Sequence, residues 1–430
     1  MTRPDSSPPP ARRIGWFRWV ICLLLFLATT INYMDRQVIS ILKPTLMSDI
    51  GWNEIDYSNV VFAFQAAYAI GYGGGGWFMD RVGTRFGYAA SVLVWSLAAM
   101  GHAFVRTVTG FGAARLVLGL AEGGNFPVAV KTVSEWFPKR ERALAAGIFN
   151  SGTSVALVLT PLFVPWLTLH WGWPTAFFVT GALGLVWLVL WMLLYRSPQV
   201  HPWVSTAELA HIQSDPPDPE IRISWLELLR HRQTWVFTAG ITLTAPVWWF
   251  YLFWVPGFLH DRHGLELTKF GPPLITIYLI ADAGSIAGGW LSSRLLKRGW
   301  TTNAARKTAQ LVCALCVVPV FAAATVTNLW VVTILIGLAA AAHQGFIANL
   351  YAMVSDTAPR RMVSSIVGIG GAASAVAGMC AAKATGYVLQ WTGSYVLLFG
   401  VASGAYLLAL LVMHVINPRH EPMKFTGVES

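Results

Sequence analysis

The chain has 430 residues and a formal net charge of +10, with 55% hydrophobic and only 12% charged residues. Its mean hydropathy of +0.55 and its 21 tryptophans exceed what a water-soluble globule of this length can keep away from its surface. The composition therefore excludes a soluble domain and indicates that the solvent of this chain is the lipid bilayer.

Apolar segments follow one another along the whole chain, each long enough to cross a bilayer, which takes about 20 residues in a helix. In chain order, the twelve segments cover residues 17–42, 55–79, 87–106, 109–136, 143–168, 173–195, 233–259, 269–293, 307–326, 329–355, 362–388 and 392–416. The sequence predicts an all-α integral membrane protein with twelve transmembrane helices.

A polar stretch at residues 196–232, interrupted by Pro216, Pro217 and Pro219, separates the sixth segment from the seventh. It predicts a linker between two six-helix bundles, at residues 17–195 and 233–416. Residues 1–16 are basic and rich in Pro and Ser, which is typical of a disordered tail, and residues 417–430 form a second tail.

A repeated motif supports the division into two related halves. The sequence GYGGGGWFMDRVGTRFG at residues 71–87 is followed by GSIAGGWLSSRLLKRG at residues 284–299, an offset of 284 − 71 = 213 residues. The matching positions are Gly71, Gly75, Gly76, Trp77 and Arg81 in the first copy and Gly284, Gly288, Gly289, Trp290 and Arg294 in the second. Duplicated half-bundles are typical of secondary transporters, and their glycines allow helices to approach closely.

The distribution of basic residues predicts the orientation in the membrane. Most Lys and Arg residues lie in loops on one side, whereas the opposite loops hold only Lys43, Arg106, Arg262 and Lys269. By the positive-inside rule, both termini and the linker are expected in the cytoplasm. Basic loops beside anionic lipid head groups also account for the net charge, so no nucleic-acid partner is expected.

Motifs for a metal, a cofactor or an enzymatic reaction do not stand out in the sequence. Cys313 and Cys316 form a CxxC pair inside a predicted span, without a second cysteine pair or a histidine cluster to complete a zinc site. No nucleophile with a matched base and no phosphate-binding loop is evident. The sequence therefore predicts no metal, no cofactor and no enzyme.

Charged residues inside the predicted spans cost about 2.5 to 3.5 kcal/mol each, so they need a role. Arg115 and Glu122 are seven residues apart and project from the same face of one helix. Asp35 and Arg36 add a second acid and a second arginine in the first span. An arginine favours an ionised acid and burial favours the neutral form, so such a carboxyl switches when its arginine moves or when an anionic substrate claims that arginine. These groups suit a proton-coupled carrier; a purely structural ion pair is the alternative.

Other polar and aromatic side chains are expected at mid-depth, where they would contact a polyhydroxylated substrate. Tyr68 lies about 18 Å along its helix from the loop residue Asp80, near the membrane midplane. Trp248 and Tyr251 would form an aromatic wall suited to a sugar ring. The remaining candidates are Asp282, His343, Gln344, Asn349 and Asn150. Helix packing is the alternative for Asp282, and an interfacial position is the alternative for the aromatic residues.

Several of these motifs resemble a known family. NYMDRQ at residues 32–37, DRVGTRFG at 80–87, RLVLGLAEGGNFP at 115–127, EWFPKRERA at 135–143 and AAHQGF at 341–346 are similar to the anion:cation symporter branch of the major facilitator superfamily. The resemblance covers nearly the whole chain. Within this branch the sequence looks most like bacterial hexuronate transporters, which import glucuronate or galacturonate with protons.

The resemblance implies roles for individual residues. Asp35 and Glu122 match the carboxylates linked to proton coupling, and Arg115 matches the arginine that modulates them. Arg36 matches the arginine that binds the substrate carboxylate, and Tyr68 matches a tyrosine that contacts the substrate.

The resemblance also implies a conformational latch in the loop between the second and third spans. Asp80, Arg81, Gly83 and Arg85 match the signature loop whose charges hold the half-bundles in one state, and Arg294 occupies the position of Arg81 in the second copy. Ser293 replaces the acid of this copy, so the second latch is expected to be weaker.

The sequence therefore predicts a secondary transporter that imports a hexuronate with protons by alternating access. We expect a monomer in a bacterial inner membrane, with an organic anion, protons and membrane lipids as its partners. Galactonate, glucarate, tartrate or an aromatic acid are alternative substrates for the same mechanism. A membrane nutrient sensor that binds its ligand without transporting it is an alternative of a different class.

Overall fold

The computed structural model describes residues 15–215, 225–358, 360–419 and 421–423. The predicted tails at residues 1–16 and 417–430 and the predicted linker at residues 196–232 lie partly outside the described residues. The described chain is helical throughout and contains no strand.

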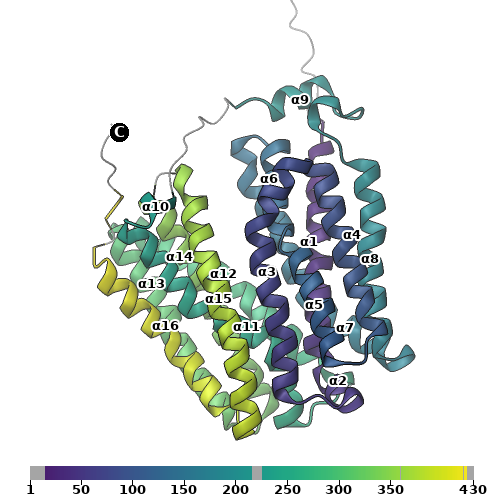
Figure 1. Cartoon of the computed structure of the whole chain (residues 1–430). Helices are drawn as coiled ribbons and strands as arrows, with labels where there is room; N and C mark the ends of the chain where they lie inside the picture. Colours follow the sequence, from purple (N-terminus) through teal and green to yellow (C-terminus); the bar gives the residue numbers. More distant parts are fainter. Residues whose placement is uncertain (1–14, 216–224, 359, 420, 424–430) are drawn as a thin grey trace, which may run out of the picture.

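Helices of the N-terminal part form one group in Figure 1 and helices of the C-terminal part form another. The first group comprises α1 (Phe17–Ile41), α2 (Lys43–Ile50), α3 (Glu54–Val82), α4 (Thr84–Gly101), α5 (Val108–Glu122), α6 (Asn125–Trp136), α7 (Lys139–Trp171) and α8 (Trp173–Leu194). The second comprises α11 (Arg232–His263), α12 (Gly271–Lys297), α13 (Thr302–Val317), α14 (Leu329–Thr357), α15 (Arg360–Thr392) and α16 (Val396–Ile416). Short helices α9 (Thr206–Ile212) and α10 (Trp225–Leu228) lie between the groups in sequence, and the 3₁₀ segments are His102–Phe104, Pro198–Val200, Leu267–Lys269 and Val318–Ala324.

All twelve predicted segments fall on helices, and ten helices in the described chain have the length and apolar character to cross a membrane. The other two segments lie at α3 and at the α5–α6 pair. The apolar stretch of α3 is diluted by Asn59, Gln65, three tyrosines and several glycines. The fourth predicted span is two helices rather than one, because the chain turns at Gly123 and Gly124. The number of spans stays a prediction.

The two groups repeat the same packing. In the first group α3 packs on α5 and α1 packs on α7, and in the second α12 packs on α14 and α11 packs on α15. Contacts between the groups are also paired, because α3 lies against α15 and α7 lies against α12. Corresponding pairs of helices therefore meet in each group.

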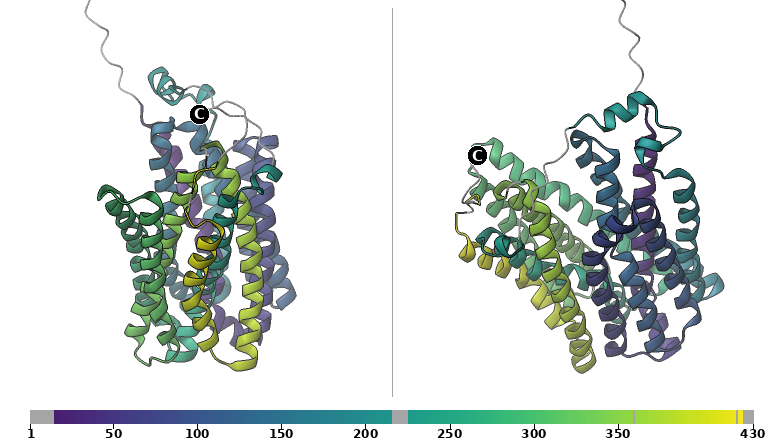
Figure 2. Two further views of the ribbon diagram at one scale, coloured as in Figure 1. Left: turned by 90° about the vertical axis from the view of Figure 1, so that its left-hand side faces the viewer. Right: turned by 45° about the horizontal axis from the view of Figure 1, so that its top comes forward.

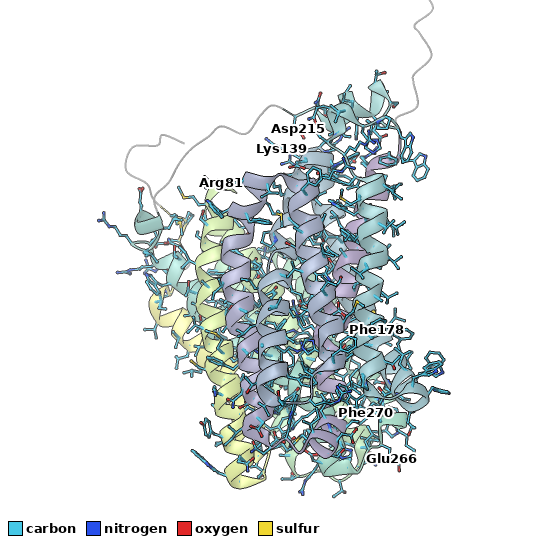
Figure 3. All side chains as sticks on the ribbon, turned by 45° about the vertical axis from the view of Figure 1, so that its right-hand side comes forward. Arg81, Lys139, Phe178, Asp215, Glu266 and Phe270 are labelled. Atoms are coloured by element: carbon cyan, nitrogen blue, oxygen red, sulfur yellow. The ribbon has the colours of Figure 1, made fainter. Side chains whose placement is uncertain are left out.

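The groups lie together at one end of the molecule and spread apart toward the other (Figures 1 and 2). The end where they spread carries α9, and Figure 3 shows Arg81, Lys139 and Asp215 there; we call it the linker end. The opposite end carries α2, with Glu266 and Phe270 near it; we call it the α2 end.

Matched glycines hold the main helix pairs in contact. A Cβ atom added to Gly71 of α3 would lie 2.1 Å from the backbone oxygen of Leu120, and one added to Gly284 of α12 would lie 2.3 Å from Ala341. Their neighbours Gly75 and Gly288 face glycine backbone in the same way. Only glycine permits this approach, so the repeated glycines position Tyr68 and Glu122 on two tightly joined helices.

We expect Gly71→Ala to destabilise the folded protein by about 1 to 3 kcal/mol, because the new methyl group must push α5 away from α3. The matched control is Gly76→Ala in the same helix, where an added Cβ meets nothing within 4 Å. Thermal unfolding of the purified protein in detergent measures both. Equal melting temperatures for the two variants would contradict the close packing of α3 on α5.

Candidate functional site

A buried ion pair joins α1 to α5. Arg36 donates from Nε and from Nη2 to Oε2 of Glu122, at 3.3 and 3.2 Å. Nη2 of Arg36 also donates to Oδ1 of Asn32, one helical turn away, at 3.2 Å. Arg36 is 1% exposed and Glu122 is not exposed at all. Each charge therefore depends on the other, because a lone buried charge is strongly unfavourable.

Aromatic rings surround the guanidinium of Arg36. Its Cζ atom lies 4.5 Å from the ring centre of Tyr33, 4.6 Å from Tyr68, 5.3 Å from Phe64 and 5.7 Å from Trp249. Ring faces attract cations and exclude water, so they stabilise the charge and shield it. Trp249 belongs to α11, so residues of both helix groups enclose Arg36.

Two further charged residues of this cluster, Arg115 and Asp35, have polar atoms without hydrogen-bond partners in the described chain. Arg115 donates from Nη1 to the backbone oxygen of Arg36 at a long 3.5 Å, and its Nε and Nη2 have no partner among the described residues. Neither carboxylate oxygen of Asp35, nor Oε1 of Glu122, has a hydrogen-bond partner in the described part of the chain. Unpaired buried groups of this kind are costly, which is typical of sites that exchange partners during function.

A cavity of about 490 Å³ lies beside this cluster, between α3, α11, α14 and α15. This volume suits a small-molecule site, which usually has about 300 to 1,000 Å³. Its wall includes Gln65, Tyr68, Tyr72, Trp249, Tyr351 and Ser374. Tyr68 and Trp249 thus line the cavity and also cover Arg36. A ligand in the cavity is one aromatic layer away from the buried arginine.

The two helix groups are joined tightly at the α2 end. The hydroxyl of Tyr57 donates to the backbone oxygen of Phe253 at 2.8 Å, and the backbone nitrogen of Glu54 donates to Gln390 at 3.1 Å. Lys383 donates to Asn59. The contacts between α3 and α15 therefore lie at the α2 end, whereas the cavity separates these helices nearer the linker end.

The family model described as Major Facilitator Superfamily matches residues 25–318. The chain belongs to this superfamily. Its fold agrees with solved members: a bacterial homologue of the human lysosomal transporter Spinster, in an inward-facing and occupied conformation, superimposes with a TM-score of 0.71 at 18% identity, covering 94% of this chain and 95% of the other. The D-xylose-proton symporter superimposes with a TM-score of 0.72 at 15% identity, covering 95% and 100%.

Sequence relatives span nearly the full length of this transporter. The D-galactonate transporter of Escherichia coli O6:H1 is 29% identical and covers 91% of this chain and 93% of its own. The hexuronate transporter of E. coli K12 is 28% identical, with 94% and 95% covered. The probable galactarate/D-glucarate transporter GudP of Bacillus subtilis is 31% identical, with 92% and 90% covered. These relatives confirm the resemblance and the prediction of a multi-pass membrane transporter rather than an enzyme.

The structure brings together only part of the predicted site of this superfamily member. Arg36, Glu122 and Arg115 form one cluster, and Tyr68 joins it to the cavity wall. The other candidates do not line the cavity: they are Trp248, Tyr251, Asp282, His343, Gln344, Asn349 and Asn150.

Several of those candidates have partners within the protein. His343 stacks on Trp248 at 5.1 Å between ring centres, and its Nδ1 lies 2.6 Å from the hydroxyl of Tyr406. Asn349 donates to the backbone oxygens of Gly288 and Gly345, at 3.0 and 2.9 Å, which ties α14 to α12.

The remaining candidates differ in exposure. Asp282 accepts a hydrogen bond from Ser154 at 2.7 Å across the α7–α12 contact. The hydroxyl of Tyr251 is buried without a partner in the described chain. Gln344 is half-buried and Asn150 is exposed.

Cavity residues outside the predicted substrate site include Gln65, Tyr72, Trp249, Tyr351 and Ser374. Trp249 was missed because of the rotation of α11 about its axis. The sequence favoured Trp248, but Trp249 is the tryptophan that reaches Arg36. The signal for Tyr351 was available, since it lies seven residues after Gln344 and therefore on the same face of α14.

The predicted latch residues lie at the linker end. Asp80 pairs with Lys131 at 2.6 Å, and Arg85 donates to the backbone oxygen of Met192 at 2.6 Å. Gly83 turns the chain with a φ of 85°, a conformation that suits glycine. Arg81 and Arg294 occupy equivalent positions, over the rings of Trp77 and Trp290.

The second helix group also has an acidic residue at the linker end, although Ser293 stands where the first copy has an acid. Asp356 of α14 pairs with Arg306 of α13 at 2.9 Å, and Arg306 also donates to Ser292 at 2.9 Å. Asp356 and Arg306 thus connect α12, α13 and α14. Because this acid comes from α14 and not from α12, aligning the two repeats position by position did not reveal it.

We expect Arg36→Met to lower the stability of the folded protein by about 3 to 5 kcal/mol, because it leaves Glu122 buried without its cation. The double variant Arg36→Met with Glu122→Gln removes both charges and should be closer to wild type. Thermal unfolding in detergent closes this double-mutant cycle. Asp35→Asn is the control, since Arg36 pairs with Glu122 and forms no salt bridge with the neighbouring Asp35 carboxylate. Additive effects of the two substitutions would contradict the ion pair.

Proposed function

We propose that this protein imports a sugar-acid anion with protons by alternating access, and that its substrate is a hexuronate, glucuronate or galacturonate. The observation that carries the proposal is the buried pair of Arg36 and Glu122 beside a cavity of about 490 Å³. The names of the relatives, which include hexuronate, galactonate and glucarate transporters, support a sugar acid as substrate.

Coupling follows from competition for Arg36. The guanidinium of Arg36 donates two hydrogen bonds to the carboxylate of Glu122, so a substrate carboxylate must replace Glu122 there. Protonation of Glu122 removes the negative charge that holds Arg36, and the substrate then supplies the anion. Because the substrate carboxylate takes the place of the Glu122 carboxylate, the charge of the buried Arg36 stays neutralised at every stage.

Asp35 and Arg115 complete the charge balance of this proposal. Asp35 takes up a second proton, because its carboxylate is buried at 1% exposure and has no hydrogen-bond partner in the described chain. Arg115 has free donors directed at the same region and favours the ionised acids after the substrate leaves.

Substrate entry requires the aromatic layer to move. Tyr68 and Trp249 cover Arg36, and in the proposed cycle they separate to admit the carboxylate and then stack on the sugar ring. Hydroxyl groups of the substrate would meet the hydroxyls of Tyr72, Tyr351 and Ser374 on the wall. The predicted contacts at Trp248, Tyr251, Asp282, His343, Gln344, Asn349 and Asn150 would require a different state of the carrier.

The proposed architecture is two six-helix domains, 17–195 and 233–416, that together span the membrane twelve times and rock around the central cavity. The basic residues at the linker end favour a cytoplasmic location for this end and both termini, in a bacterial inner membrane. The structure then corresponds to an inward-facing state, in which the Asp80–Lys131 pair belongs to the latch loop. We propose that the monomer is the transporting unit.

Uptake into proteoliposomes tests the substrate and the coupling. We expect labelled glucuronate and galacturonate to accumulate when an inward proton gradient is imposed, and not without it. Accumulation of galactonate or glucarate alone would assign the same mechanism to a different acid. Binding without any flux would indicate a sensor and overturn the proposal of transport.

Asp35→Asn separates exchange from accumulation. We expect this variant to exchange labelled for unlabelled substrate across the membrane, because Arg36 is intact, but to lose accumulation driven by a proton gradient. Counterflow and gradient-driven uptake in the same proteoliposomes measure the two activities. Wild-type accumulation at every pH would exclude a coupling role for Asp35.

A further inference from the structure

Gln65 of α3 is buried at 3% exposure, yet both atoms of its amide lack a hydrogen-bond partner in the described chain. A buried amide normally has partners, because an unsatisfied one costs about 1 to 3 kcal/mol. Gln65 lines the central cavity, so a ligand in that cavity can supply what the protein does not. An unpartnered amide on a residue of the cavity wall thus points to a polar ligand.

A second cavity, of about 290 Å³, lies behind Gln65. It is an open pocket between α11, α15 and α16, and its lining is apolar apart from Gln65 and Thr385. Leu397 and Val401 on its outer side are 57% and 62% exposed, on the lipid-facing surface of α16. We call this space the side pocket.

Three residues form the partition between the side pocket and the central cavity. Gln65 and Trp249 line both cavities. Gly378 of α15 lies against both of them, since a Cβ added there would be 3.1 Å from Oε1 of Gln65 and 3.2 Å from Cδ1 of Trp249. The side chain of Gln65 thus stands between the two cavities, and it is the polar member of the partition.

We propose that Gln65 determines the specificity of this carrier in two ways: its amide binds hydroxyl groups of the sugar acid, and its bulk sets the upper size of the substrate. The inference rests on the proposed function, because it takes a sugar acid as the ligand of the central cavity. Trp249 lies 5.7 Å from Cζ of Arg36, so a carboxylate bound at Arg36 places the sugar ring beside the partition. Acids with a large apolar substituent at the far end are excluded because Gln65 blocks the side pocket.

Two substitutions at this position separate the roles. Gln65→Met keeps the length of the side chain and removes the amide, whereas Gln65→Ala removes both. The ligands are glucuronate, its monodeoxy analogues, and 4-nitrophenyl β-D-glucuronide, which carries an aryl group on the sugar. Binding to the purified full-length protein is measured by titration in detergent or nanodiscs.

For Gln65→Met we expect glucuronate to bind about tenfold more weakly, which corresponds to one or two lost hydrogen bonds. At least one deoxy analogue should bind wild type more weakly than glucuronate does, and Gln65→Met should no longer distinguish the two. The melting temperature of Gln65→Met should equal or exceed that of wild type, because the variant removes an unsatisfied buried amide.

For Gln65→Ala we expect a gain of function: 4-nitrophenyl β-D-glucuronide should bind this variant, but not wild type or Gln65→Met. A misfolded protein cannot produce this result. Wild-type affinities in Gln65→Met, or exclusion of the aryl glucuronide by Gln65→Ala, would overturn the corresponding role of Gln65. If wild type binds neither glucuronate nor galacturonate, the proposed substrate itself is wrong, and the two failures are therefore distinguishable.

Discussion

The cost of burying charge in a bilayer governs this structure. Arg36 and Glu122 lie on helices that are distant in sequence, and neither charge is tolerable without the other at such depth. Their pairing links α1 to α5. The same dependence makes the pair exchangeable, since any anion that replaces Glu122 must bring a carboxylate to the same guanidinium. Structural constraint and proposed coupling therefore have one physical origin.

Close glycine contacts make each helix group a firm support for this site. Gly71 and Gly284 bring their helices to backbone contact with α5 and α14, so Tyr68, Gln65 and Glu122 keep their relative positions. Contacts between the groups include polar bonds near the α2 end, such as Tyr57 to Phe253, and the hydrogen bond from Ser154 to Asp282 across the α7–α12 contact. The proposed rocking of the two groups would have to break bonds of this kind and form others.

The aromatic residues that lie between Gln65 and Arg36 connect the proposed specificity residue to the buried charge cluster. Tyr68 and Trp249 cover the arginine from the cavity, and Trp249 also joins Gln65 in the partition. In the proposed mechanism, a substrate that displaces this aromatic layer would contact both the charge that holds its carboxylate and the amide that binds its hydroxyls. Recognition at the two ends of the ligand would thus depend on Trp249.

The sequence by itself determined the helical membrane class, the positions of the helical segments and the four charged residues of the first half. These follow from local rules, because the bilayer selects long apolar stretches and makes any charge within them conspicuous. It did not determine which tryptophan of α11 faces Arg36, that Asp80 pairs with Lys131, or that Asp356 supplies the acid missing at Ser293. Those features depend on how each helix is rotated and which distant helix it meets. Only tertiary packing sets these relations, since side-chain contacts between helices leave no periodic signal along a single chain.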